Sequence, residues 1–411
     1  MEYILREEYL NFLHRWRDKS VIKVVSGVRR SGKSTLLAMY KEQLKSINIS
    51  DEQIIAINFE DLHFYELRDF QKLHQYIKDK AFANSKKYYI FLDEIQHVLS
   101  FEEAIDSLQL RQNLDIYITG SNAFFMSGEL ATLLSGRYVE LKILPLSFKE
   151  FIAYRKKIDR KLKANIAYYN EYLKSSFPYA VSLTDEERLE YLQGLYATVV
   201  VKDIANRLGA VDTPTLEMII EYLYGEIGSF INFKTISDFL RNDKNDLVCT
   251  QPVKSAPKTI ERYVTKIEES LLLYRASRYS IKGKKFLAQN FKYYAVDIGL
   301  RRLIAGYRTQ DYGHILENIV YLELLRRGFS VYVGLVDNLE VDFLAMKQNG
   351  ERQYIQVAFK TENSKTLQRE LLPLQKISDN YPKLLLTLDD IDSYANYEGI
   401  EKKSTLDWLR E

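Results

Sequence analysis

Residues 21–34 read VIKVVSGVRRSGKS, and this stretch decides the fold of the first part of the chain. The apolar run Val21–Val25 predicts a short strand, and the pattern from Lys33 to Leu44 predicts a helix. Between them stands G-x-x-x-x-G-K-S, the order of a phosphate-binding loop. Its glycines let the backbone curl so that N–H groups point at phosphate oxygens, and the helix start adds partial positive charge. The stretch therefore predicts an ATP site formed by Gly27, Arg30, Ser31, Gly32, Lys33, Ser34 and Thr35.

A second motif supplies the acidic residues that such a site needs. Tyr88–Leu92 is an apolar run that predicts a strand, and Asp93 and Glu94 follow at its end. A carboxylate in this place organises Mg²⁺ in phosphoryl transfer, so we expect Asp93 and Ser34 to hold the metal while Lys33 reaches the β- and γ-phosphates. Glu94 is the expected general base, because a neighbouring carboxylate can polarise the water that attacks the γ-phosphate.

Strand-like and helix-like segments alternate over about the first 145 residues. This alternation predicts an α/β domain with a parallel sheet and helices on both faces. The expected strands are Val21–Val25, Ile54–Phe59, Tyr88–Leu92, Ile116–Thr119 and Tyr138–Ile143, and the expected helices are Lys33–Leu44, Tyr65–Phe82, Phe101–Leu110 and Gly128–Leu134.

Five short stretches then follow one another in order: GVRRSGKS (27–34), FLDEIQ (91–96), YITGSNA (117–123), LSGRY (134–138) and LPLSFKEF (144–151). On these stretches the chain resembles the prokaryotic AAA+-type P-loop ATPases that carry a C-terminal domain of unknown function with a restriction-nuclease-like core. The resemblance covers essentially the whole chain. It implies that a polar residue at the end of the strand Ile116–Thr119 senses the γ-phosphate or positions the attacking water. Asn122 is the best match, with Ser121 and Thr119 behind it. Relatives often have a Gly-Gly-aromatic-Pro turn where this chain has Ser175-Ser176-Phe177-Pro178, so the lid is expected to differ in detail.

Arg137 has two interpretations from the residues around it. It is either an arginine finger that offsets transition-state charge or the anchor of a helix or strand end. An arginine supplied by a neighbouring subunit would serve the same purpose, so a homo-oligomer is among the expected partners.

The charge balance limits the classes of function. Lys and Arg total 58 and Asp and Glu 56, a formal net charge of +2, which excludes a uniformly basic nucleic-acid binder. The amino terminus has no apolar signal segment, and no run of about 18 apolar residues predicts a membrane span. The single cysteine, Cys249, cannot form an internal disulfide or a Cys-based zinc site. We expect a soluble cytoplasmic protein without a membrane partner.

Four domains are predicted along the chain, because the pattern turns helical after Ser147 and returns to mixed strand and helix near residue 313. They are a P-loop ATPase domain (1–146), a helical lid (147–212), a winged-helix-like domain (213–305) and a restriction-nuclease-like domain (306–411) whose site is degenerate.

The segment 251–292 is locally basic, with ten basic and three acidic residues and a net charge of +7. Three of the basic residues recur every fourth position on one face of a predicted helix. This helix, the helix Lys234–Leu240 before it and the predicted hairpin after it resemble a winged helix-turn-helix, which places its second helix in the major groove. The alternatives are a solvated basic face or a protein-binding module. The predicted contacts to double-stranded DNA are Lys258, Arg262, Lys266, Lys284 and Lys285.

From about residue 313 the order helix, strand, strand, strand, helix, strand resembles the PD-(D/E)xK nuclease core. There an acidic residue and a second Glu, Asp or Gln hold Mg²⁺, and a lysine two positions later activates water. Asp342 and Gln356 match the first two places, but the lysine position falls on Ala358. Glu317 is a compensating carboxylate, whereas Lys360 would lie about 7 Å further along the strand. We therefore expect Glu317, Asp342 and Gln356 to form a degenerate nuclease site used for binding or assembly.

These patterns favour a Mg²⁺-dependent ATPase whose nucleotide state controls a DNA-binding half, with Lys33, Glu94, Asn122 and Arg137 as its catalytic residues. One alternative is a signalling or scaffold switch that hydrolyses ATP slowly and binds a protein partner. Another is an ATP-gated nuclease, which the alanine at position 358 disfavours.

Overall fold

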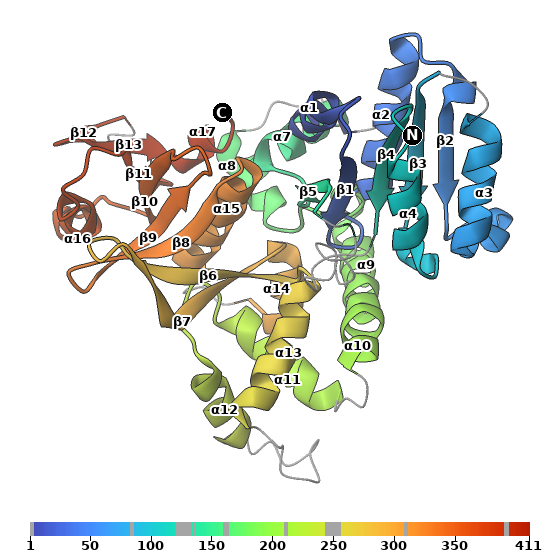
Figure 1. Ribbon diagram of the computed structural model, residues 1–411. Helices are drawn as coiled ribbons and strands as arrows, with labels where there is room; N and C mark the ends of the chain where they lie inside the picture. Colours follow the sequence, from blue (N-terminus) through green and yellow to red (C-terminus); the bar gives the residue numbers. More distant parts are fainter. Residues whose placement is uncertain are drawn as a thin grey trace. The chain divides into compact units, whose positions relative to one another are not determined.

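The computed structural model describes residues 4–82, 86–120, 134, 136–158, 164–208, 213–242, 256–307, 311–389 and 394–411. The chain divides into two units, one of Met1–Pro145 with Glu269–Leu271 and one of Leu146–Glu268 with Leu272–Glu411. Figure 1 shows the elements of both units in sequence colours. Within the described ranges, no helix is both long enough and apolar enough to cross a membrane.

A five-stranded sheet forms the centre of the first unit. Its order is β2-β3-β4-β1-β5, and every neighbouring pair is parallel. This confirms the predicted parallel α/β sheet. The carboxyl ends of parallel strands share one edge, so the ends of β1, β3 and β4 meet there. The strands are β1 (Ile22–Gly27), β2 (Ile54–Asn58), β3 (Tyr88–Asp93), β4 (Leu114–Thr119) and β5 (Tyr138–Ile143).

Helices cover both faces of this sheet (Figure 1). α1 (Glu7–Trp16) and α2 (Lys33–Ser46) pack on one face in a cluster that includes Val25. α3 (Phe70–Ala81) and α4 (Phe101–Gln109) pack on the other face with Val24. Successive residues of a strand point to opposite faces, so the apolar run of β1 is buried on both sides.

The predicted helix Tyr65–Phe82 is split in two. Leu62–Arg68 forms a 3₁₀ helix, and α3 begins only after Asp69, whose carboxylate accepts the N–H groups of Gln71 and Lys72. An aspartate that caps these orphan donors starts a helix rather than continuing one. Two further short 3₁₀ turns are Asp51–Gln53 and Ile95–His97. Most of the predicted helix Gly128–Leu134 lies outside the described residues.

Helices make up the first half of the second unit. The turn Ser175-Ser176-Phe177-Pro178 is held by the buried carboxylate of Asp297, which accepts hydrogen bonds from the hydroxyls of Ser175 (3.2 Å) and Ser176 (2.7 Å). Asp297 also caps the helix α14 (Ile298–Ala305), because it accepts the N–H of Leu300. Both serines of this turn therefore have a hydrogen-bond partner. The helices are α7 (Phe148–Ile158), α8 (Asn165–Tyr172), α9 (Asp185–Thr198), α10 (Asn206–Leu208), α11 (Thr213–Gly225), α12 (Phe233–Asn242), α13 (Pro257–Glu269) and α14 (Ile298–Ala305), with a 3₁₀ turn at Ala180–Ser182 and a π-helical stretch at Val199–Ala205.

An eight-stranded mixed sheet forms the second half of this unit, in the order β12-β13-β11-β10-β9-β8-β6-β7. α15 (Tyr312–Arg326) packs against β7 to β10, and α16 (Ser364–Gln375) packs against β9, β10, β11 and β13. The predicted order of helix, three strands, helix and strand is present. The strands are β6 (Leu273–Ser280), β7 (Lys285–Ala295), β8 (Ser330–Val336), β9 (Leu339–Met346), β10 (Arg352–Ala358), β11 (Lys383–Thr387), β12 (Asn396–Tyr397) and β13 (Ile400–Ser404), and the chain ends with α17 (Thr405–Trp408).

The hairpin expected to be a wing is part of this sheet. β6 pairs with β7 in antiparallel fashion, but it also pairs with β8 in parallel fashion, from Arg278 opposite Val333 to Ser280 opposite Leu335. A free-standing wing is therefore wrong, and the boundary predicted at 305/306 runs through one sheet. Alternation along β6 indicates a strand with one buried face, but it does not say which strand lies beside it.

Candidate functional site

The phosphate loop follows β1 and has a backbone that needs its glycines. Gly27 has a φ of +151°, and a Cβ there would lie 2.3 Å from the carbonyl oxygen of Ile143. Gly32, with a φ of 98°, is the left-handed N-cap of α2, and Arg30 between them also has a positive φ, of 64°. A side chain at either glycine would clash or strain the backbone. The loop is therefore a tight, pre-shaped turn at a helix start, as an anion site requires.

Lys33 lies within this loop rather than out in solvent. It is 5% exposed, and its Nζ donates to the carbonyl oxygens of Gly27 (3.0 Å) and Val28 (3.3 Å). Ser34 and Thr35, in the first turn of α2, are exposed. The loop thus presents a cation and two hydroxyls at one helix terminus.

The acidic pair lies at the same edge of the sheet, at the end of β3. The Thr119 hydroxyl, at the end of β4, donates to the Asp93 carboxylate and accepts the backbone N–H of Glu94 at 2.9 Å. β4 lies between β3 and β1 in the sheet. One threonine therefore aligns both carboxylate residues beside the phosphate loop.

Glu94 is held in an uncommon conformation. Its backbone is left-handed (φ 56°, ψ 50°), and its carboxylate accepts a hydrogen bond of 2.6 Å from the side-chain amide of Gln96. Left-handed backbone in a residue other than glycine costs roughly 1 kcal/mol or more and concentrates at functional sites. From the sequence, Thr119 is expected only as a weaker match than Asn122 for the γ-phosphate sensor. Gln96 is not expected at the site, although it stands in the quoted stretch FLDEIQ.

The other two predicted catalytic residues are Asn122 and Arg137. Asn122 lies outside the described residues. Arg137 is exposed at the opposite edge of the sheet, where its carbonyl oxygen accepts the N–H of Ile22 (3.0 Å) at the start of β1. The phosphate loop follows the other end of β1, about 17 Å away along the strand. Arg137 as an arginine finger for its own chain is therefore wrong; its backbone anchors the start of β5.

The predicted DNA contacts fall into two separate groups in the second unit. Lys258 and Arg262 are exposed on α13 and Lys266 is half-buried, and Arg262 also donates to the carbonyl oxygen of Leu208 (2.6 Å). Lys284 and Lys285 are exposed at the turn between β6 and β7. Figure 1 shows β6 running away from the end of α13, so the turn lies at the far end of that strand. The predicted DNA contacts therefore form two separate basic patches, one on α13 and one at the turn between β6 and β7.

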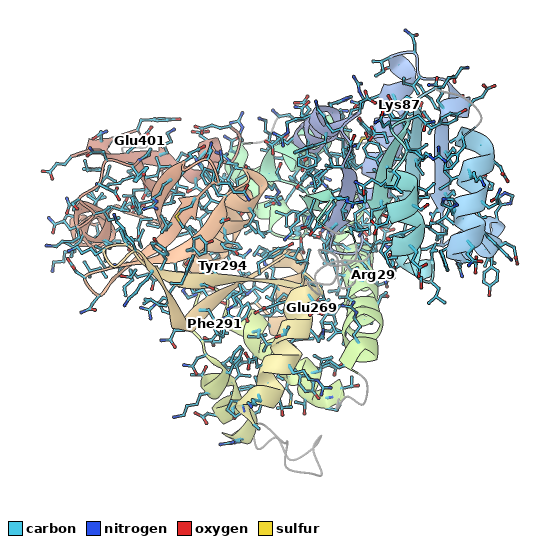
Figure 2. All side chains as sticks on the ribbon, viewed as in Figure 1. Arg29, Lys87, Glu269, Phe291, Tyr294 and Glu401 are labelled. Atoms are coloured by element: carbon cyan, nitrogen blue, oxygen red, sulfur yellow. The ribbon has the colours of Figure 1, made fainter. Side chains whose placement is uncertain are left out.

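The predicted nuclease residues meet a lysine that we did not expect there. Glu317, Asp342 and Glu340 place carboxylate oxygens within 4.8 Å of one another. Lys292, from β7, is 4% exposed; it pairs with Glu317 at 2.9 Å and also with Glu340. Tyr294, labelled in Figure 2, donates its hydroxyl to Glu317 as well. A cation of the protein's own thus stands among the carboxylates.

Hydrogen bonds and burial close this cluster. Asp342 accepts the backbone N–H of Val357 (2.8 Å), and Gln356 connects the Asp342 backbone (3.3 Å) to Glu370 (2.9 Å). Burial, and then the charge of Glu317, raise the pKa of Asp342 well above its ordinary value. Burial alone would lower the pKa of Lys292, but the attraction of Glu317, Asp342 and Glu340 outweighs it and raises that pKa.

Lys360, the substitute lysine considered from sequence, does not join the cluster. Its side chain is 58% exposed and pairs with Glu362 at 3.3 Å. Glu340 stands two residues before Asp342, and strand periodicity could have revealed it. Lys292 was counted with the basic segment, and its burial removes it from any surface.

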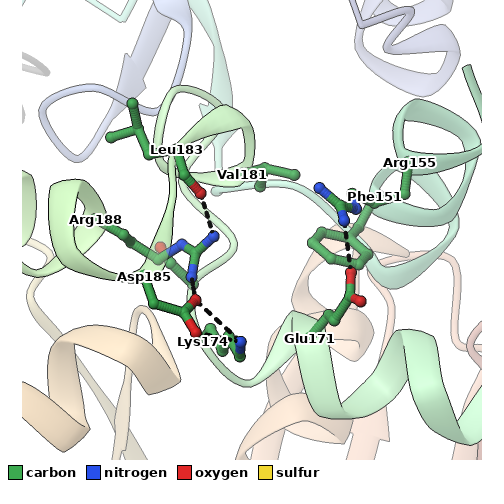
Figure 3. Close-up of a pocket in the computed structure, with 9 residues that line it drawn as sticks. Phe151, Arg155, Glu171, Lys174, Val181, Leu183, Asp185 and Arg188 are labelled. Atoms are coloured by element: carbon green, nitrogen blue, oxygen red, sulfur yellow. Dashed lines mark hydrogen bonds and ion pairs between the residues drawn. The ribbon is translucent and has the colours of Figure 1, made fainter. Parts of the chain in front are cut away.

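The segment predicted to be a lid (147–212) contains a small cavity of about 190 Å³, shown in Figure 3. Arg155 pairs with Glu171 (2.9 Å), and Lys174 pairs with Asp185 (2.7 Å). Arg188 also pairs with Asp185 and donates to the carbonyl oxygen of Leu183 (2.6 Å). Each charged side chain of the cavity thus has an ion-pair partner within it, with Asp185 shared by two cations, and we assign no ligand to the cavity.

The fold and the site of the first unit define a class, the P-loop ATPase domain of AAA+-like type. Residues 19–152 match the family described as "AAA domain", and residues 166–311 match "Domain of unknown function (DUF8612)". The predicted ATPase class is confirmed. The nuclease-like core stays a prediction, and so does the winged-helix domain apart from its free-standing wing.

Two relatives match almost end to end. An uncharacterized protein of Haemophilus influenzae is 41% identical over 408 residues, covering 99% of this chain and 98% of that protein. An uncharacterized protein of Methanocaldococcus jannaschii is 30% identical over 406 residues, covering 93% of this chain and 83% of that protein. The chain belongs to the family of these two proteins.

The chain also resembles solved structures, at much lower identity. A Walker-type ATPase of Pyrococcus abyssi has a TM-score of 0.48 and 15% identity, covering 74% of this chain and 96% of that one. AMPPCP-bound DnaA from Aquifex aeolicus has a TM-score of 0.32 and 12% identity, covering 65% of this chain and 90% of that one.

Proposed function

We propose that this protein is a Mg²⁺-dependent ATPase whose nucleotide state controls a DNA-binding second unit. One observation carries the ATPase: the phosphate loop, Asp93 and Glu94 lie at one edge of the sheet, and Thr119 joins the two acids there. Ser31 supports the same reading, because its buried hydroxyl has no hydrogen-bond partner among the described residues. A donor of this kind inside a phosphate loop fits a phosphate oxygen.

Lys33 is suited to the β- and γ-phosphates. Its ammonium group has three N–H donors, and it already points into the loop at the carbonyls of Gly27 and Val28. A charged phosphate oxygen is a stronger acceptor than a neutral carbonyl, so triphosphate binding draws this ammonium toward the ligand.

Asp93 and Ser34 would hold Mg²⁺, which would supply positive charge against the negative charge that develops on the phosphates. Thr119 fixes the direction of the Asp93 carboxylate through its hydroxyl. Ser34 is exposed in the first turn of α2, so its hydroxyl is accessible to the metal.

Glu94 would accept the proton of the attacking water. The Gln96 amide holds one oxygen of its carboxylate at 2.6 Å and leaves the second oxygen to take the proton. Because the N–H of Glu94 is tied to Thr119, the base and the metal ligand keep a fixed relation.

We infer that the second unit contacts double-stranded DNA through α13. Lys258 and Arg262 are exposed at helical spacing on one face, and phosphate contacts of this kind need no base-specific groups. Lys284 and Lys285, at the far end of β6, form a separate basic spot and provide a matched comparison.

The test is steady-state ATP hydrolysis with and without duplex DNA, at low and at physiological salt, with Lys33→Ala as the blank. We expect turnover that DNA stimulates and that salt suppresses, because binding releases counterions. Lys258→Gln should weaken the stimulation, whereas Lys284→Gln, which removes the same charge elsewhere, should not.

Two outcomes would contradict the proposal in different ways. Turnover no greater than that of Lys33→Ala would overturn the ATPase. Turnover that is indifferent to DNA would overturn the DNA role alone and favour the alternative, a switch that binds a protein partner.

A further inference from the structure

Arg6 is a buried arginine that donates a hydrogen bond to the phosphate loop. It stands just before α1 and is 3% exposed. Its Nη1 donates to the carbonyl oxygen of Ser31 at 3.0 Å, and its guanidinium lies 4.5 Å from the centre of the Tyr9 ring. Burying a guanidinium is costly unless it is hydrogen-bonded, so these contacts hold its position firmly.

The bond to Ser31 has a direct consequence for phosphate binding. In a trans peptide the C=O of one residue and the N–H of the next point in opposite directions. Because the Ser31 carbonyl points to Arg6, the N–H of Gly32 points away from Arg6. That N–H is one of the groups with which such a loop holds phosphate oxygens.

The same guanidinium holds the segment that leaves the first unit. Its Nη2 donates to the carbonyl oxygens of Leu144 (2.9 Å) and Pro145 (3.3 Å), and Pro145 is the last residue of that stretch of the unit. The Tyr9 hydroxyl accepts the N–H of Leu144 at 3.2 Å. One side chain therefore connects the nucleotide loop with the exit of the unit.

A second contact ties the same two segments. Gly27 is paired in register with Ile143, and the approach is so close that a Cβ on Gly27 would lie 2.3 Å from the Ile143 carbonyl oxygen. Strand pairing and close packing thus couple the position of Gly27, the first residue of the loop, to that of Ile143, the residue before Leu144.

We propose that Arg6 is a positioning residue for the phosphates of the nucleotide and links the loop to residues 144–145. It orients the Ser31–Gly32 peptide and carries a change in the loop to the chain that leads out of the first unit. The inference rests on the proposed function, since it requires that the loop binds a nucleoside polyphosphate.

The experiment compares Mg-ATP and Mg-ADP binding by the wild-type chain, Arg6→Lys and Arg15→Lys. A lysine keeps the charge at position 6 but cannot reach three carbonyls at once. Loss of one orienting charge-assisted hydrogen bond predicts that both dissociation constants rise about tenfold in Arg6→Lys. The turnover number at saturating ATP should change less than about threefold, because Asp93 and Glu94 are untouched. Arg15, exposed on α1 and stacked on Phe12, is the matched control.

Hydrogen exchange on the wild-type chain gives a second readout that does not depend on a variant's folding. ATP should protect peptides covering 27–36 and also those covering 140–147. Protection confined to the loop would overturn the link to the exit segment. Wild-type affinity in Arg6→Lys would overturn the positioning role, whereas no ATP binding by the wild-type chain would overturn the proposed function itself.

Discussion

Lys33 and Lys292 are both lysines with little exposure, yet their surroundings give them opposite uses. Lys33 donates to two neutral carbonyl oxygens of its own loop, which a phosphate oxygen can replace. Lys292 pairs with the carboxylates of Glu317 and Glu340, so its charge already has partners within the protein. A lysine held by carbonyls can serve a ligand, whereas a lysine held by carboxylates is already satisfied.

The acidic residues differ in the same way. Asp93 and Glu94 are half-buried at the end of a strand, where the sheet edge receives a ligand. Glu317 and Asp342 are 6% and 8% exposed, and the second has a raised pKa because it is buried. The comparison teaches that residue type and spacing do not separate a reacting site from a structural ion-pair cluster; exposure and partners do.

The largest expected effect is on the ATP turnover number, which should depend on the acidic pair Asp93 and Glu94 but not on the cluster around Asp342. Glu94→Gln removes the proposed general base while keeping the size of the side chain. We expect the turnover number to fall about 10²–10⁴-fold with ATP binding retained. Steady-state kinetics and nucleotide binding measure this, with Asp342→Asn as the matched acid-to-amide control. Normal turnover in Glu94→Gln would contradict the assignment of the base.

Replacing Lys292 should lower the stability of the folded protein but leave nucleotide binding unchanged. Lys292→Met leaves the buried Glu317 and the half-buried Glu340 without their cation. Loss of one partner of a buried ion pair typically costs about 3–5 kcal/mol. We expect a lower melting temperature together with an unchanged dissociation constant for Mg-ATP. A variant as stable as the wild type would show that Lys292 does not hold the cluster together.

Gln96→Ala tests whether the orientation of the Glu94 carboxylate matters for turnover. The amide that holds the Glu94 carboxylate is lost, so the base becomes less well oriented. We expect the turnover number to fall about tenfold, as for the loss of one hydrogen bond to a charged group, with little change in the Michaelis constant. Gln96→Glu would place a like charge beside Glu94 and should be slower still. Equal loss of ATP affinity would point to a structural role instead.

The smallest effect concerns pH. The folded chain keeps a proton on Asp342 that the unfolded chain releases above the ordinary pKa of 3.8, because burial raises the folded-state pKa. Wild-type stability therefore falls as the pH rises from about 4 toward neutral, a loss that asparagine does not undergo. Asp342→Asn should melt about 2–4 °C higher than wild type at pH 7, and the difference should vanish near pH 4. A lower melting temperature at pH 7 would mean that the ionised carboxylate is stabilised by Lys292.

The parallel sheet of the first unit could be predicted because its signals are local. Each strand is a short apolar run, and the glycines of the loop mark the turn that follows β1. The helix predicted over Tyr65–Phe82 is wrong at Asp69. The Asp69 side chain caps a new helix there, so the segment forms two helices instead of one. The meeting of Asp93 and Glu94 with the loop followed from the rule that parallel strands end at one edge.

The second unit was less predictable because its key contacts join residues far apart in the chain. The strand character of β6 was visible in the sequence, but its pairing with β8 was not. Lys292 reaches Glu317 across 25 positions, so it was read as part of a basic surface. Arg6 bonds to Leu144 across 138 positions, and no local pattern announces such a contact.

The most direct test of the account is calorimetric titration of Mg-ATP into the wild-type chain, Lys33→Ala and Lys292→Met under the same conditions. The account predicts that Lys33→Ala binds at least about 100-fold more weakly, as for loss of a buried charge-assisted contact, while Lys292→Met binds as the wild type does. Wild-type affinity in Lys33→Ala, or an equal loss in both variants, would contradict the claim that only the first lysine serves the nucleotide.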